Sequence, residues 1–147
     1  MSMLNLNQSS TKIRLGVLLT MIGFGAFLLG ADPGLFGLDR SPLVGFVQTF
    51  TFSAGLAVIC LGGFISLKAS QDPDREQTIA QDIGLRLVAT GYLISLVSAM
   101  ADVFGFGTQT WPVAPFFGPW QAAGVLIGEI IISIGFLLYI PFTGRGQ

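Results

Sequence analysis

The chain has 147 residues, of which 52% are hydrophobic and only 10% are charged, and its formal net charge at pH 7 is −1. Soluble domains carry about 25% charged residues, so this composition indicates an integral membrane protein. There is no histidine, one cysteine and no cluster of Lys or Arg. These features argue against haem, most zinc sites, an intrachain disulfide and a nucleic-acid partner, and we expect no cofactor.

Four apolar stretches predict four transmembrane helices, because about 20 apolar residues suffice to cross a bilayer. A turn at Asp32-Pro33-Gly34 separates the first two, and Asp72 followed by Pro73 resembles an N-cap and first helical residue for the third. The membrane part of that third helix is expected between Arg86 and Asp102. The expected helices span residues 13–31, 42–67, 73–102 and 117–140.

The basic residues predict one orientation in the membrane. Lys and Arg lie almost entirely on the side of the two termini and of the hydrophilic segment 68–82, and the opposite side has only Arg40. The positive-inside rule then places both termini and segment 68–82 in the cytoplasm. We expect a single membrane domain over residues 1–147, in a multi-pass protein of a bacterial inner membrane. The residues on the cytoplasmic side are Lys12, Arg14, Lys68, Arg75, Arg86 and Arg145.

The two halves of the chain share spaced identities. At an offset of 73, the set Pro42, Gly45, Gln48, Gly55 and Gly62 recurs as Pro115, Gly118, Gln121, Gly128 and Gly135. At an offset of 70, the set Thr20, Ala31, Asp32, Phe36 and Gly37 recurs as Thr90, Ala101, Asp102, Phe106 and Gly107. We therefore predict an all-α four-helix bundle of two tandemly duplicated hairpins, residues 13–67 and 83–141. Such a parallel repeat has a pseudo-twofold axis along the membrane normal. Compositional bias is the alternative.

Small residues recur at intervals of seven in all four expected helices. A seven-residue period keeps one narrow stripe facing a neighbouring helix, and small residues there allow close backbone approach in lipid. This pattern predicts that Gly55, Gly62, Gly128 and Gly135 are helix-packing residues. A glycine-lined pore is the alternative.

Glu129 is the one carboxyl in the middle of an apolar run, and its counterpart at offset 73 is Leu56. A charged side chain at this depth costs about 2.5–3.5 kcal/mol on insertion scales, so we expect something to offset it. Ser53, Thr20, Tyr92 and Ser95 supply hydroxyls at similar depth, and Ser133 lies one turn on from Glu129. Glu129, Tyr92, Ser95 and Ser133 form the candidate intramembrane polar site. A partner chain, a proton- or cation-coupled role, and a lipid or ligand contact are the alternatives.

Two candidate polar clusters lie near the outer surface. Asp32 with Gln48, and Asp102 with Gln121, occupy matching places in the two repeats. Bracing of the hairpins is the structural interpretation, and a paired outer binding site is the functional one.

For function we expect a small, non-catalytic accessory or scaffolding subunit that contacts lipids and packs against other membrane proteins or itself. No nucleophile motif, phosphate loop or metal-ligand spacing is present, and nothing assembles the acid–base groups that catalysis needs. The alternative is a small transporter or channel that uses Glu129 as its coupling residue. An intramembrane enzyme acting on lipid or quinone is a third hypothesis, which needs a polar cluster at one depth.

Overall fold

The computed structural model describes residues 3–38, 45–72, 74, 76–106 and 118–140. This part of the chain is helical and contains no strand: α1 (Met3–Ala31), the short 3-10 helix η1 (Pro33–Phe36), α2 (Phe46–Ala69), α3 (Ile79–Ala99) and α4 (Pro119–Tyr139). Four of these helices are long and apolar enough to cross a membrane. The predicted class, a multi-pass helical membrane protein, is confirmed at this level.

The helix boundaries differ from expectation where local chemistry overrides the apolar pattern. α1 begins at Met3, well before residue 13, because the preceding polar segment contains neither Gly nor Pro to stop a helix. α3 begins at Ile79 and ends at Ala99. The expected start at Pro73 is therefore wrong. Pro73 itself, together with the expected first residues of the second and fourth helices, lies outside the described residues.

Thr78 is the N-cap of α3. The Gln81 N–H donates to Thr78 Oγ1 (3.3 Å), and the Thr78 N–H donates to Gln81 Oε1 (2.9 Å). This reciprocal pair is a capping box, which satisfies two backbone donors at once. Asp72, the expected cap, instead accepts a hydrogen bond from the Asp74 N–H within its own turn (3.3 Å).

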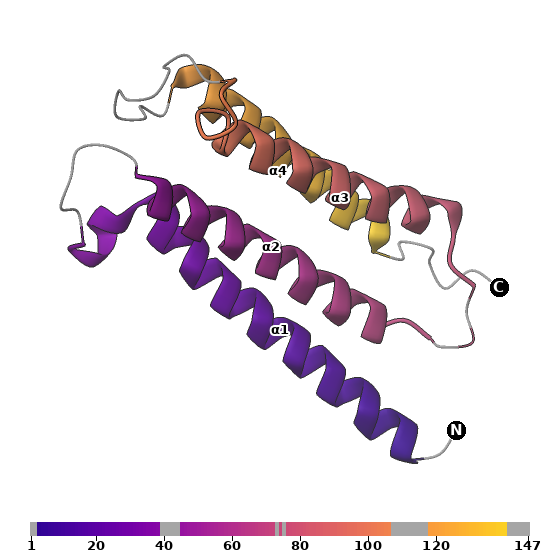
Figure 1. Cartoon of the computed structure of the whole chain (residues 1–147). Coiled ribbons are helices and arrows are strands. Elements are labelled where there is room, and N and C mark those ends of the chain that lie inside the picture. Colours follow the sequence, from indigo (N-terminus) through magenta and orange to yellow (C-terminus); the bar gives the residue numbers. More distant parts are fainter. Residues whose placement is uncertain (1–2, 39–44, 73, 75, 107–117, 141–147) are drawn as a thin grey trace.

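The four long helices form two antiparallel hairpins. α1 packs along α2 and α3 packs along α4, and α2 lies between α1 and the second hairpin (Figure 1). The start of α1, the α2–α3 connection and the end of α4 lie at one end of the bundle, here called the inner end. The end of α1, η1, the start of α2, the end of α3 and the start of α4 lie at the opposite, outer end.

Glycines lie at the closest approaches inside each hairpin. A methyl group at Gly16 would lie 2.7 Å from the Gly62 carbonyl oxygen, and one at Gly91 would lie 2.6 Å from that of Gly128. Backbone therefore touches backbone in both hairpins, a geometry that a side chain at these positions would prevent. Gly55 and Gly135 lie at the same kind of contact, against Gly23 and Gly84.

The same backbone contacts recur in the two hairpins. The glycine contacts of α2 and α4 match at the offset of 73, but the turns after α1 and α3 do not match at 70. The turn after α1 holds the bonds Gly37 N–H to Gly34 O and Leu38 N–H to Pro33 O, and the turn after α3 holds Gly105 N–H to Asp102 O and Phe106 N–H to Ala101 O. These bonds match at an offset of 68, as do the two positive-φ residues, Gly37 and Gly105. The difference between offsets 73 and 68 makes the second outer connection five residues longer, whereas the identities, at offsets 73 and 70, predict three.

The hairpins meet across a small apolar core. Leu56 of α2, Val88 of α3 and Ile132 of α4 are buried together there. Four half-buried residues pack around them: Phe27, Cys60, Tyr92 and Phe136. Cys60 thus has a packing role in this core.

Polar side chains close the inner end on backbone carbonyls. Ser9 Oγ donates to the Ala69 carbonyl (2.6 Å), which ties the start of α1 to the end of α2. The Gln71 side-chain amide donates to the Tyr139 carbonyl (3.4 Å), which ties the α2–α3 connection to α4, and the Gln81 amide donates to the same carbonyl (3.5 Å), which ties α3 to α4 within the second hairpin. Carbonyls in the last turn of a helix have no intrahelical partner, so these bonds satisfy groups that otherwise need water.

Candidate functional site

Glu129 lies on the side of α4 that turns towards the first hairpin. Phe136, seven residues further on, shares this direction because seven residues make almost two whole turns. The Phe136 ring covers Gly63 of α2, where a methyl group would lie 3.0 Å from Phe136 Cζ. Glu129 is half-buried, while the next residue, Ile130, is exposed. The carboxyl group is therefore at the edge of the contact between the two hairpins, within an apolar span.

No hydroxyl of the candidate intramembrane site is bonded to the Glu129 carboxyl. Ser133 Oγ donates to the backbone carbonyl of Glu129 (2.9 Å), and Ser95 Oγ donates to that of Val125 (3.2 Å). Tyr92 reaches across to the Ser53 carbonyl of α2 (3.5 Å). Short hydroxyls in helices commonly donate to main-chain carbonyls, so the protons of these hydroxyls are already used, and none of their oxygens contacts the Glu129 carboxyl among the described residues.

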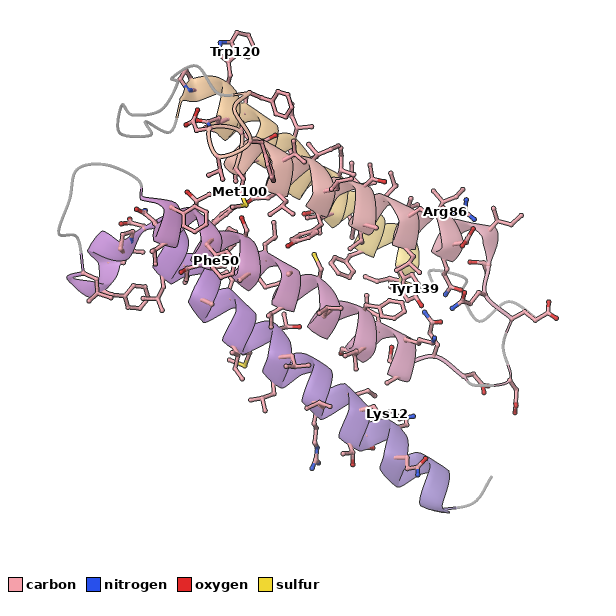
Figure 2. The ribbon with its side chains drawn as sticks, viewed as in Figure 1. Lys12, Phe50, Arg86, Met100, Trp120 and Tyr139 are labelled. Atoms are coloured by element: carbon pink, nitrogen blue, oxygen red, sulfur yellow. The ribbon has the colours of Figure 1, made fainter. Side chains whose placement is uncertain are left out.

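The Glu129 carboxyl consequently has no hydrogen-bond or ion-pair partner within the described residues. The ion pair found there, Arg86 Nη2 to Asp82 Oδ2 at 2.9 Å, is exposed on α3. Figure 2 shows Arg86 on the outside of α3, far along the helix from the outer end. The energetic cost of placing Glu129 in the membrane could be compensated in several ways. The geometry argues against one of them, a hydrogen bond to a hydroxyl of the described chain.

The two predicted outer clusters are not held together by hydrogen bonds among the described residues. Asp32 Oδ1 accepts from the Gly34 N–H (3.1 Å) and so caps η1, its own outer turn. Gln121 Oε1 accepts from the Gly118 N–H (2.7 Å) at the start of α4. Gln48 is half-buried without a bond to Asp32. Asp32 and Gln121 thus each satisfy a local backbone group rather than a partner across the hairpin.

Asp102 is not the structural counterpart of Asp32. At the offset of 68, Asp102 matches Gly34, and Asp32 matches Met100. Asp102 Oδ1 is buried and has no hydrogen-bond partner among the described residues. A paired, symmetric outer binding site therefore has no support in the positions of the two carboxylates.

The structure also contains polar contacts that the sequence analysis missed. The Thr78–Gln81 capping box had a readable signal, since Thr-x-x-Gln before an apolar run is its usual pattern. The Gln71 and Gln81 bonds to the Tyr139 carbonyl had none, because they depend on how the end of α4 lies against the α2–α3 connection and the start of α3. Among the described residues, no group of three or more His, Cys, Asp or Glu could hold a metal ion.

Two buried serines give a direct test of these assignments. Ser95 Oγ makes an interhelical bond, so Ser95→Ala is expected to lower the free energy of unfolding by about 0.6 kcal/mol, and by at most about 1.7. Ser53 Oγ is buried without a partner within the described chain, so the same change there is expected to be neutral or stabilising. Unfolding in mixed micelles with increasing SDS measures both; equal losses would contradict the assignment.

Comparison with protein-family models, with curated proteins and with solved structures found no match to this chain. The functional argument therefore depends on the geometry alone. That geometry offers one half-buried carboxyl in a membrane span and no second titratable group bonded to it. A lone carboxyl can donate or accept a hydrogen bond or exchange a proton, but it does not form the acid–base pair that most hydrolytic chemistry uses.

Proposed function

We propose that this protein is a small, non-catalytic accessory or scaffolding subunit that packs against other membrane chains, with Glu129 at the point of contact. One observation carries the proposal: the Glu129 carboxyl is half-buried in a membrane span and has no partner within the described chain. Polar side chains in a span usually pair with another polar group. A polar group of a neighbouring chain is the simplest source of that missing partner.

The distribution of apolar side chains supports an interaction role. Large apolar residues are exposed along α1 and α4, and the described residues outside the four spans are few. Lipid covers such surfaces equally well, so apolar exposure alone would not distinguish a partner from the bilayer. The carboxyl does distinguish them, because lipid tails offer it no hydrogen bond.

We also infer an origin by duplication and a cytoplasmic inner end. The recurrence of glycine contacts and turn bonds at offsets of 68 and 73 supports a duplicated hairpin. Lys12 and Arg86 lie towards the inner end and Trp120 lies at the outer end, pointing away from the bundle (Figure 2). Basic residues favour the cytoplasmic side and Trp favours an interface, so this arrangement supports termini in the cytoplasm.

Purification from native membranes in a mild detergent tests the proposed function. An affinity-tagged chain is expected to be recovered with stoichiometric amounts of a second membrane chain or of its own untagged copy. The variant Glu129→Leu is expected to lose most of that partner, whereas Ile127→Ala, on a different side of the same helix, is expected to keep it. Recovery of the unaltered protein only as a free monomer would overturn the proposal.

Proteoliposomes separate this function from transport. An accessory subunit is expected to give no ion or proton flux on its own, and Glu129→Gln is expected to change nothing in that assay. Flux that Glu129→Gln abolishes would instead assign a coupling role to the carboxyl.

A further inference from the structure

The contact between the two hairpins uses a defined stripe of α2. Ser53, Leu56 and Cys60 follow each other at helical spacing, and Ser53 and Leu56 are buried. The stripe receives α3 through two residues: Tyr92 donates to the Ser53 carbonyl, and Val88 is buried in the same core as Leu56. We call Ser53, Leu56 and Cys60 the α2 stripe.

α4 carries the equivalent stripe, and the described residues cover it only at its Glu129 edge. At the offset of 73 that relates the contact glycines of α2 and α4, the α2 stripe corresponds to Leu126, Glu129 and Ser133. Leu126 is 58% exposed, Ser133 is exposed and Glu129 is half-buried. We call these three residues the α4 stripe.

α1 likewise carries the equivalent of the surface by which α3 docks. At the offset of 68, Val88 and Tyr92 correspond to Thr20 and Phe24. Local contacts support this register: a methyl group at Gly62 would lie 2.6 Å from Thr20 Oγ1, and one at Gly135 would lie 2.8 Å from Val88 Cγ2. Yet Phe24 is 53% exposed, and no contact like that between α3 and α2 joins α1 to α4 among the described residues.

We propose that α1 of a second copy of this chain docks on the α4 stripe, in the way that α3 docks on the α2 stripe within one chain. The inference rests on the proposed function and names the partner. Phe24 of one copy then lies over Leu126 of the other, as Tyr92 lies over Ser53. Thr20 of one copy faces Glu129 of the other, as Val88 faces Leu56.

Matched chemistry on the two surfaces is the argument for a second copy. Within the chain an apolar residue, Leu56, shares the core with an apolar residue, Val88. On the α4 stripe the residue that corresponds to Leu56 is Glu129, and on α1 the residue that corresponds to Val88 is Thr20, so both members of the proposed pair are polar. The Thr20 hydroxyl donates to the Gly16 carbonyl (2.9 Å), so its oxygen keeps a lone pair that can accept a hydrogen bond from a neutral Glu129 carboxyl. A lipid tail would provide no such acceptor.

Cysteine cross-linking tests the placement. In a Cys60→Ser background, chains with Phe24→Cys and chains with Leu126→Cys are co-expressed and treated in membranes with a short bismaleimide. A cross-linked dimer is expected in the mixture and not with either variant alone, because the contact joins unlike surfaces. Ile127→Cys is the matched control: it is 53% exposed but points to a different side of α4, so its dimer yield with Phe24→Cys should fall to background.

The double variant Phe24→Cys/Leu126→Cys separates the remaining outcomes. A cross-link within one chain, seen as a monomer of altered mobility, would overturn the proposal in favour of α1 closing on its own α4. Absence of any cross-link would overturn it in favour of lipid or a different protein on the α4 stripe. In that second case co-purification of another chain would leave the proposed function standing, so the two failures are distinguishable.

A compensating pair of substitutions tests the Thr20–Glu129 contact itself. Thr20→Val leaves the carboxyl of the other copy without an acceptor and is expected to weaken the dimer about 3- to 20-fold. Thr20→Val with Glu129→Leu reproduces the Val88–Leu56 pair and is expected to restore the dimer to within about 3-fold of the unaltered protein. Dissociation constants come from energy transfer between labelled chains in bilayers. Losses that simply add in the double variant would contradict the contact.

Discussion

Replacing Gly23 with Ala is expected to lower the free energy of unfolding by about 1–3 kcal/mol, the usual range for overpacking a close contact. The added methyl group would lie 2.7 Å from the Ile59 nitrogen and 2.9 Å from the Gly55 carbonyl oxygen. Both are backbone atoms of α2, which cannot rotate away as a flexible side chain can. The two helices of the first hairpin must therefore separate, and every interhelical contact along them weakens.

Gly25→Ala is the matched control for this prediction. Gly25 lies two residues along the same helix, and a methyl group there meets nothing within 4 Å. Because Ala is about 1 kcal/mol better than Gly inside a helix, Gly25→Ala is expected to be neutral or stabilising. SDS-induced unfolding in mixed micelles, followed by far-UV circular dichroism, measures both variants. Similar behaviour of the two would mean that backbone contact at Gly23 does not hold the hairpin together.

The sequence predicted the transmembrane helices and the glycine contacts because both depend on local, repeated physical requirements. A span needs a run of about 20 apolar residues, which can be counted. A close helix contact in lipid needs small residues at one spacing, and Gly16, Gly23, Gly55 and Gly62 have it. The structure places these four at the contact between α1 and α2.

The register between the hairpins could not be predicted, because identity and structural equivalence differ in the first helix of each half. The identities pair Asp32 with Asp102 at an offset of 70, whereas the turn bonds match at 68. A shift of two residues rotates a helical position by about 200°, so it moves a side chain to the other side of the helix. The expected symmetry of the two polar clusters depended on that pairing; Asp32 and Gln121 satisfy local backbone groups instead, and Asp102 Oδ1 has no partner among the described residues.

The surroundings of Glu129 could not be predicted for a related reason. Depth can be counted along a sequence, but whether a hydroxyl at the same depth is free cannot. Ser133 and Ser95 are at suitable depths, yet each donates to a main-chain carbonyl. The position of Glu129 on α4, at the edge of the contact with α2, emerges only when Phe136 is seen over Gly63.

Replacing Glu129 with Leu is expected to favour membrane insertion of α4 by about 3 kcal/mol, the largest effect we anticipate for a single substitution. The carboxyl has no partner within the described residues, so its removal breaks no bond in that part of the chain. Leu at this position also copies Leu56 of α2, which is buried in the core between the hairpins. The change is measured by placing α4 in a reporter membrane protein and following its membrane insertion by glycosylation mapping.

The stability of the isolated protein and its association are expected to respond to Glu129→Leu with opposite signs. The free energy of unfolding of the isolated chain is expected to rise, because a polar group without a partner among the described residues is removed from the span. The affinity of the complex is expected to fall, because the carboxyl that would hydrogen-bond to the partner chain is absent. Ser133→Leu is the control: it also makes α4 more apolar, but it leaves the carboxyl in place and should affect insertion far less. A Glu129→Leu chain that unfolds more easily as a monomer would show that the carboxyl has an internal partner. A chain that is more stable alone yet no longer assembles would show that Glu129 is retained for a neighbour.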